Sequence, residues 1–258
     1  MNISLQKSKV FMFFIFAMAI LIAFLAVELI IIKYRGEPVP APSIPREITS
    51  FGTGSELNFL VLGDSTSVGQ GSSYENSVAY KTAHYLSEQN KVNLLNLGVS
   101  GTEIGEVSSS QLPNLDKFQP DIALISAGAN DVTHLSSLSK IRDGLNDSID
   151  LLIKNNCNIK IIVTGSPAMG TIPRFPQPIR SIAGFRTNQV NQIFIETAKT
   201  RNLTFAPIAE KTREQFAQDP SLFAKDLFHP NARGYSTWIP VLSDAVDDAL
   251  QNQPSHCN

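Results

Sequence analysis

The stretch Asn58-Phe-Leu-Val-Leu-Gly-Asp-Ser-Thr-Ser67 joins an unbroken apolar run to a cluster of small polar residues. Consecutive apolar residues without alternation are typical of a strand that is buried on both faces of a parallel sheet. The polar residues predict a loop at the carboxyl end of this strand. In open α/β sheets, binding residues gather at that edge. The stretch therefore predicts a fold class and indicates where to search for function.

The rest of the chain repeats this pattern, because helix-periodic segments separate further short apolar runs. Strands are predicted at 58–62, 92–97, 121–126, 159–164 and 203–207, and helices at 77–89, 138–154, 187–200 and 232–250. Alternating strands and helices favour an α/β protein with a parallel five-stranded sheet that is covered on both faces. Right-handed crossovers then bring the carboxyl ends of the strands to one edge.

A long apolar run lies near the N-terminus, after a short segment of residues 1–9. Residues 10–32 contain one charged side chain, Glu28, and lysines flank the run. As a helix it spans about 34 Å, enough to cross a hydrocarbon core. We expect an uncleaved transmembrane signal-anchor, with the remaining chain outside the cell membrane. The alternative is a cleaved signal peptide and a secreted protein, but the run is long for one and ends without small residues.

Four prolines mark residues 33–53 as a linker, expected to act as a stiff spacer off the membrane. A domain at 54–252 and a tail at 253–258 follow. The net charge of −2 lacks the basic excess of a nucleic-acid binder, and two cysteines and four histidines favour no metal centre. We expect a monomer. Pairing of Cys157 with Cys257 stays open.

Four polar clusters follow predicted strands or lie near the C-terminus: 63–67, 96–101, 128–131 and 226–230. Together they hold the groups that acyl transfer needs. Ser65 is the candidate nucleophile, His229 the base, and Asp226 the group that orients the base. The amides of Ser65 and Gly101 and the side chain of Asn130 are candidate oxyanion donors.

Each cluster has a plainer interpretation when it is taken alone. Gly63-Asp64-Ser65 also suits an ordinary turn, and Asn130-Asp131 suits a helix N-cap. Asp131 and His134 repeat the Asp-x-x-His spacing, so they compete with Asp226 and His229. The order and spacing of the four clusters therefore carry more weight than any single one.

In that order, the clusters resemble the sequence blocks of the SGNH hydrolase superfamily, also called the GDSL lipase/esterase family. Gly63-Asp64-Ser65 matches the first block, Gly101 the second, Asn130 the third, and Asp226-x-x-His229-Pro230 the last. The resemblance covers about residues 57–250. Thr66 departs from it, since many members carry leucine there.

The resemblance implies a three-layer α/β/α flavodoxin-like sandwich, with no metal or cofactor. It also implies ester hydrolysis through an acyl-enzyme on Ser65, with Asp226 and His229 as acid and base and Ser65, Gly101 and Asn130 as the oxyanion hole. The Gly-x-Ser-x-Gly motif of the α/β-hydrolases is missing from the sequence.

Residues 165–185 are predicted to form a long loop after the fourth strand. Loops of this length are uncommon unless they are functional or disordered. Its apolar residues Met169, Ile172, Phe175 and Ile179 are candidates for a lid or acyl-binding wall over Ser65. Alternatively, the loop only covers the end of the sheet.

The sequence thus predicts a membrane-anchored, extracytoplasmic serine esterase or lipase. Its expected substrates are lipid, lysophospholipid or other acyl esters. An O-acetyl esterase acting on envelope carbohydrate and an acyltransferase remain alternatives. A non-catalytic binding module on the same fold is more remote, because a complete Ser, His and Asp set is present.

Overall fold

The computed structural model describes residues 2–115 and 117–257, of which 2–10 are described by their backbone alone. Its centre is a sheet with the strand order β1-β3-β2-β4-β5-β6. The strands are β1 (Thr49–Phe51), β2 (Glu56–Gly63), β3 (Lys91–Asn96), β4 (Ile122–Ser126), β5 (Lys160–Val163) and β6 (Thr204–Phe205). The five strands β2 to β6 are parallel, as the sequence predicts.

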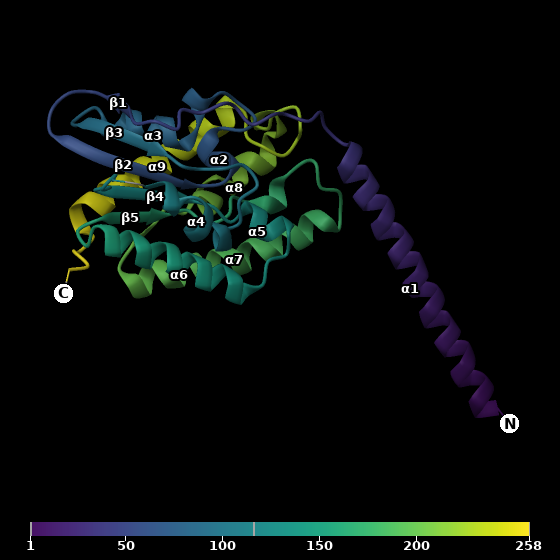
Figure 1. Ribbon diagram of the computed structural model, residues 1–258. Coiled ribbons are helices and arrows are strands. Elements are labelled where there is room, and N and C mark those ends of the chain that lie inside the picture. The colour runs from purple at the N-terminus through teal and green to yellow at the C-terminus, as the bar shows by residue number, and fades with distance from the viewer. Residues whose placement is uncertain (1, 116, 258) are drawn as a thin grey trace.

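Helices cover both faces of this sheet (Figure 1), so the α/β/α sandwich is confirmed. On one side α4 packs against α6, and α6 against α7; on the other, α9 packs against α3 and α8. These helices are α3 (Val78–Leu86), α4 (Ile104–Ser110), α6 (Leu138–Asn155), α7 (Ile179–Arg201), α8 (Ile208–Gln218) and α9 (Ala232–Asn252). Short helices α2 (Ser65–Val68) and α5 (Ala129–Thr133) follow β2 and β4. Single 3₁₀ turns lie at η1 (Tyr74–Asn76), η2 (Leu112–Leu115), η3 (Met169–Thr171) and η4 (Pro220–Leu222).

Helix α6 illustrates why the periodic segments fold as predicted. Ser137 caps its N-terminus, because the Ser137 hydroxyl accepts the Lys140 N–H. Its apolar residues Ile141, Leu145 and Ile149 recur at helical spacing and are fully buried. The central strand β2 is likewise buried on both faces, which explains its unbroken apolar run.

The segment assigned to a linker is folded onto the domain. Residues 49–51 form β1, which pairs antiparallel with β3 and adds a sixth strand to the sheet. Residues 36–46, which we call the strap, also contact the domain through hydrogen bonds described below. The stiff spacer expected at 33–53 is thus in contact with the domain over residues 36–46 and 49–51, because proline composition indicates an extended chain but not whether that chain packs against a surface.

The predicted loop at 165–185 ends earlier than expected. Helix α7 begins at Ile179, directly after Pro178, and packs against η3. The prolines of this segment end at 178, and a proline before the first helical turn is compatible with a helix start. The loop proper is therefore 164–178, and Ile179 belongs to a helix.

The tail predicted at 253–258 is held against the domain. Gln253 is buried and exchanges two hydrogen bonds with the backbone of Ile161. Cys157 and Cys257 form a disulfide, which settles the open pairing. The folded unit thus extends from β1 to this disulfide, beyond both predicted domain boundaries.

An apolar helix, α1 (Asn2–Tyr34), projects from the domain (Figure 1). An 18-residue window within residues 11–34 has a mean hydropathy of 3.0, and the helix is long enough to cross a membrane. A signal sequence near the N-terminus has the same properties.

Candidate active site

The turn that presents Ser65 is fixed by buried contacts. Gly63 ends β2 with a φ of 137°, and a Cβ atom there would lie 1.9 Å from the Ser126 carbonyl oxygen. Asp64 N–H donates to that same oxygen at 3.0 Å. Only glycine fits both this close approach and this positive φ. The chain therefore turns sharply and places Ser65 at the first position of α2.

Ser65, His229 and Asp226 form one chain of hydrogen bonds. Ser65 Oγ lies 3.1 Å from His229 Nε2, and His229 Nδ1 lies 2.6 Å from Asp226 Oδ2. The contact with the carboxylate assigns the ring proton to Nδ1, which leaves Nε2 free to accept the serine proton. The structure thus brings together three residues that lie up to 164 positions apart.

Asp226 is nearly fully buried, and its charge is stabilised from several sides. Its Oδ1 accepts the N–H groups of Phe228 and His229, both at 3.0 Å. Burial acts to raise the pKa of Asp226, but the bond to His229 and these backbone donors hold it below its usual value. The carboxylate is therefore charged at neutral pH and oriented toward the imidazole.

Asp64, beside the candidate nucleophile, behaves oppositely. Complete burial raises its pKa to about 6, although hydrogen bonds from Thr66 act to lower it. Its Oδ1 accepts both the N–H and the hydroxyl of Thr66 at 2.9 Å. Asp64 thus caps α2.

The two other candidate oxyanion donors lie on neighbouring loops. Gly101 is exposed, has a φ of 91° and has open space where a Cβ would be. The Asn130 side-chain amide donates to the Thr102 carbonyl at 3.0 Å, which ties its loop to that of Gly101. Val99 N–H donates to the Gly63 carbonyl at 3.0 Å, which ties the Gly101 loop to the Ser65 turn.

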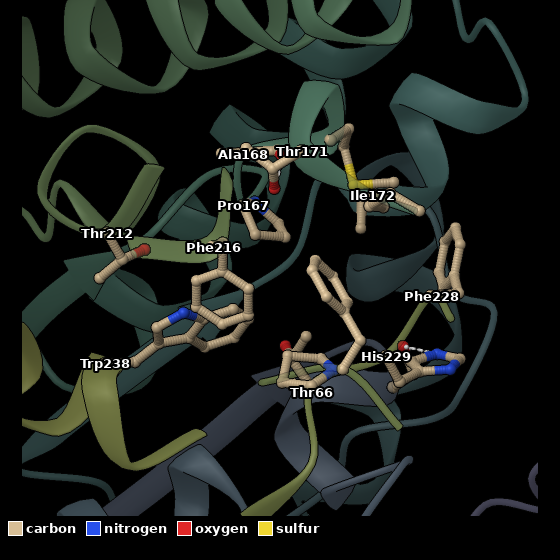
Figure 2. A pocket seen from close by; sticks show the side chains of 15 residues that line it. Thr66, Pro167, Ala168, Thr171, Ile172, Thr212, Phe216, Phe228, His229 and Trp238 are labelled. Carbon is tan, nitrogen blue, oxygen red and sulfur yellow. Dashed lines mark hydrogen bonds between the residues drawn. The ribbon is translucent and has the colours of Figure 1, made fainter. Parts of the chain in front are cut away.

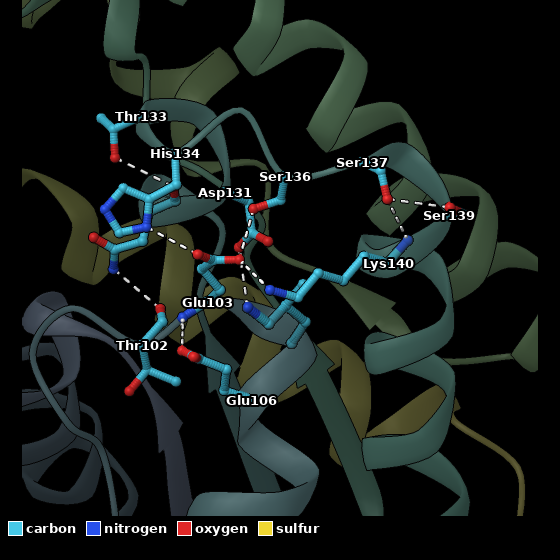
Figure 3. A network of polar contacts seen from close by, with 12 residues as sticks. Thr102, Glu103, Glu106, Asp131, Thr133, His134, Ser136, Ser137, Ser139 and Lys140 are labelled. Carbon is cyan, nitrogen blue, oxygen red and sulfur yellow. Dashed lines mark hydrogen bonds and ion pairs between the residues drawn. The ribbon is translucent and has the colours of Figure 1, made fainter.

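A network of polar contacts around Glu103 joins the segments that follow these two loops (Figure 3). Glu103 accepts hydrogen bonds from Lys140 at 2.7 Å and Ser136 at 2.7 Å, and contacts His134 at 2.9 Å. The bond from Lys140 is the main reason that the pKa of Glu103 falls to about 2. Sequence reasoning missed Glu103, because its partners come together only in the fold.

The competing pair, Asp131 and His134, does not form. His134 bonds to Glu103 instead, and Asp131 Oδ2 accepts the Ile104 N–H at the start of α4. Asp131 therefore caps a helix.

Ser65 and His229 both line a cavity, and Figure 2 shows His229 among its walls. The volume of this cavity is about 30 Å³. Its walls are mostly apolar and come from the Ser65 turn, the loop before α7, α8, and the segment from η4 into α9. The lining residues are Ser65, Thr66, Ala129, Pro167, Ala168, Met169, Thr171, Ile172, Thr212, Phe216, Phe223, Phe228, His229, Pro230 and Trp238.

The four predicted wall residues divide into two groups. Met169 and Ile172 line the cavity. Phe175 is buried behind it and stacks edge-on against Phe228, with ring centroids 5.8 Å apart, and Ile179 packs against the core. Trp238 and Phe216 are buried and also line the cavity. Sequence reasoning did not place these two aromatic residues near Ser65.

Within residues 2–115 and 117–257, no group of three or more His, Cys, Asp or Glu side chains is arranged to hold a metal ion.

Fold and site together define an α/β/α protein with a hydrogen-bonded Ser–His–Asp set at the carboxyl edge of its sheet. A family model for the GDSL-like lipase/acylhydrolase family matches residues 61–236, and the chain belongs to this family. It is also 27% identical over 205 residues to a GDSL-like esterase of Mycobacterium tuberculosis, which covers 76% of this chain. The chain spans 63% of the length of that relative.

Several solved structures have a similar fold. A lipolytic protein of the G-D-S-L family from Veillonella parvula superposes with a TM-score of 0.60 at 16% identity, covering 76% of this chain and 99% of that one. Phospholipase A1 from Streptomyces albidoflavus gives 0.58 at 15% identity, covering 73% and 98%. The esterase EstA from Pseudoalteromonas gives 0.57 at 20% identity, covering 76% and 99%. At these identities the likeness establishes the fold.

Proposed function

We propose that this protein is a membrane-anchored, extracytoplasmic serine esterase that hydrolyses carboxylic esters. The observation that carries the proposal is the continuous contact from Ser65 Oγ through His229 to Asp226. Membership of the GDSL-like lipase/acylhydrolase family supports it. The apolar α1 supports the anchor, and the Cys157–Cys257 disulfide supports an oxidising compartment outside the cytoplasm.

The reaction follows from the roles of these groups. His229 Nε2 takes the Ser65 proton while Ser65 Oγ forms a bond to the ester carbonyl carbon. The bond from that carbon to the alcohol oxygen then breaks, and the alcohol takes the proton from Nε2. A water molecule next gives a proton to Nε2 and attacks the acyl-enzyme, which releases the acid and returns the proton to Ser65. Asp226 stabilises the imidazolium in both steps.

The negative oxygen that develops in each step needs donors. The N–H groups of Ser65 and Gly101 and the second N–H of the Asn130 side chain fill this role. Asn130 is already oriented by its bond to the Thr102 carbonyl, so little reorganisation is required. Removal of one such donor is expected to lower kcat by about 10²–10³-fold.

We further propose that the cavity takes the acyl group. Its volume of about 30 Å³ favours acyl groups of a few carbons, and Phe216 and Trp238 add bulky aromatic side chains to its wall. The alcohol would then point outward, where a large group is tolerated. This favours short-acyl esters, including the O-acetyl alternative, over long-chain lipids. An acyltransferase differs only in resolving the acyl-enzyme with an alcohol.

Labelling of the full chain with a fluorophosphonate tests the nucleophile. We expect the wild type to be labelled, and the Ser65→Ala and His229→Ala variants to lose labelling. Ser100→Ala is the matched control, because Ser100 lies at the same edge but bonds to Gln70. Unlabelled, folded wild type would contradict an activated Ser65. Hydrolysis of nitrophenyl esters of increasing acyl length then tests the cavity, and faster hydrolysis of octanoate than of acetate would contradict it.

A further inference from the structure

The C-terminal part of α1, from residue 25 to residue 32, is packed against the catalytic domain. Glu28 is buried, and Leu25 and Ile32 are half-buried, whereas the residues between them are exposed. The spacing i, i+3, i+7 places these three side chains on one face of the helix. The Ile32 carbonyl also accepts the side chain of Arg174 at 2.9 Å. The domain therefore covers about 10 Å of the same helix that is apolar enough to enter a bilayer.

The strap continues this attachment across the catalytic edge (Figure 1). It contacts three of the four segments that carry or adjoin the candidate catalytic groups. Glu37 N–H donates to the Lys225 carbonyl at 3.0 Å, next to Asp226. The Val39 carbonyl accepts Gln70, just after α2, at 2.9 Å, and Arg46 donates to the Gly98 carbonyl at 3.1 Å.

Gly36 shows how close this attachment is. A Cβ at Gly36 would lie 2.4 Å from the Asp226 carbonyl oxygen, and its φ is 84°. Arg174 N–H donates to the Leu227 carbonyl at 3.0 Å, so the residue that holds Ile32 also holds the Asp226–His229 loop. The helix, the strap and this loop thus form one packed unit. Anchoring α1 in a membrane would set the orientation of the catalytic edge.

Exposed apolar side chains lie at this same edge. Phe185 is 65% exposed and Ile182 52% exposed on the first two turns of α7, which follow the loop of Arg174. Leu135 is 67% exposed on the loop after α5. Arg186 donates to the Ser136 carbonyl and so places the α7 residues beside Leu135. We call Leu135, Ile182 and Phe185 the rim patch.

Leu135 is notable for its backbone as well as its exposure. Its φ is 56°, in a region where leucine is uncommon and where glycine or asparagine would fit a surface turn more easily. The side chain is therefore displayed outward at a conformational cost, without any contact in the core. Clustered exposed apolar residues of this kind mark sites of contact with other surfaces.

Given the proposed membrane anchoring, we infer that the rim patch inserts into the interface of the bilayer that α1 crosses. The catalytic edge then lies on the membrane surface, and the esters that it meets are those whose alcohol part resides in the membrane. The occupant of the patch is lipid, because α7 begins shortly after Arg174, whose side chain holds the Ile32 carbonyl near the end of α1. Apolar helix faces next to an anchor bind bilayer interfaces through their buried area.

A fluorescence experiment tests the contact without relying on activity. Full-length Phe185→Cys carries an environment-sensitive nitrobenzoxadiazole label and is reconstituted in vesicles of phosphatidylcholine and phosphatidylglycerol with brominated acyl chains. Leu151→Cys, on an exposed position near the end of α6, is the matched control. Cys157 and Cys257 are paired and leave the new thiol as the labelling site. We expect the label at 185 to be quenched at least twofold, and the label at 151 to be unaffected. Equal quenching at both positions, or none at 185, overturns the inference.

A second arm separates this inference from the proposed function. The Ile182→Ser/Phe185→Ser variant is expected to hydrolyse a soluble nitrophenyl acetate at the wild-type rate. Its rate of hydrolysis of an acetate ester of a lipid alcohol in the same vesicles is expected to be at least fivefold lower than that of the wild type. Equal rates of variant and wild type on the vesicle ester overturn the inference. A wild type that hydrolyses neither ester contradicts the esterase, whereas the quenching result still decides the membrane contact.

Discussion

Gln111 brackets Gly63: its side-chain oxygen accepts the Gly63 N–H, and its side-chain nitrogen donates to the Gly63 carbonyl, both at 2.8 Å. Gln111 is fully buried at the end of α4, and Gly63 is the last residue of β2. An amide side chain thereby completes the hydrogen bonds of the strand at the point where the chain turns toward Ser65. The position of the candidate nucleophile therefore depends on a residue 48 positions away.

Replacing this bracket should disturb both stability and catalysis. Gln111→Leu leaves the Gly63 N–H buried without its partner, while the carbonyl keeps the Val99 N–H. We expect a loss of about 1–3 kcal/mol in the free energy of unfolding, measured with urea, together with a lower kcat. Asn114→Ala, which removes an exposed bond to Ser110, is the control and should change stability by less than about 0.5 kcal/mol. Equal stability of the two variants would show that the bracket is dispensable.

The charge on Asp226 should matter more than its shape. Asp226→Asn keeps an oxygen for the N–H groups of Phe228 and His229 but cannot stabilise a protonated imidazole. We expect kcat to fall at least about 10²-fold with little change in KM. Steady-state kinetics on nitrophenyl acetate measure this. A loss smaller than threefold would mean that another group orients His229.

Asp64 should make stability depend on pH between about 4 and 6. The pKa of Asp64 in the folded state is raised to about 6 from 3.8. Its contribution to the free energy of unfolding is therefore fully present below pH 3.8 and is lost as the pH rises through 6. Asp226 acts in the opposite direction, because its pKa is lowered and its contribution is lost as the pH falls. The Asp64→Asn variant loses the pH dependence that comes from Asp64 and keeps the one that comes from Asp226.

Urea unfolding at pH 3.5 and pH 7.5 compares this variant with the wild type. The free energy of unfolding of the wild type should fall, relative to that of the variant, by about 3 kcal/mol from pH 3.5 to pH 7.5. Other titrating groups are common to both proteins and cancel in the comparison. Parallel stability curves for the two proteins would argue that Asp64 titrates normally.

Widening the cavity should shift the preferred acyl length. Met169→Ala removes a wall side chain and makes room for about two more methylene groups. At about 0.8 kcal/mol for each buried methylene, the ratio of kcat/KM for hexanoate to that for acetate should rise about tenfold. Ile195→Ala, on an exposed position of α7, is the control. An unchanged ratio for Met169→Ala would place the acyl group elsewhere.

The disulfide should stabilise the fold through its long loop. Cys157 and Cys257 are separated by 100 residues, for which chain entropy predicts about 4–5 kcal/mol. We expect urea unfolding of the Cys157→Ser/Cys257→Ser variant to show that a large part of this stabilisation is lost. Its rate of nitrophenyl acetate hydrolysis at low temperature should stay within twofold of the wild-type rate. A reducing agent should reproduce the loss in the wild type and leave the variant unchanged.

The amino-acid sequence by itself determined the order and type of most of the main elements, but not β1, α4 or α8. The unbroken run at 58–62 and the periodicity of residues 138–154 report local burial, so β2 and α6 follow from them directly. The sequence also singled out Ser65, His229 and Asp226, because the four polar clusters occur in the order and spacing of the family's sequence blocks. These are signals carried by the order of residues along the chain.

Tertiary structure alone decided what depends on contacts between distant residues. The docking of the strap on the catalytic loops, the bond of His134 to Glu103 and the bracket of Gln111 on Gly63 have no local signature. The cavity is another case, since Phe216 and Trp238 line it together although they lie on different helices, α8 and α9. Which buried side chain faces the nucleophile is settled when helices pack on the sheet, because packing geometry, and not hydrophobicity, distinguishes one apolar residue from another.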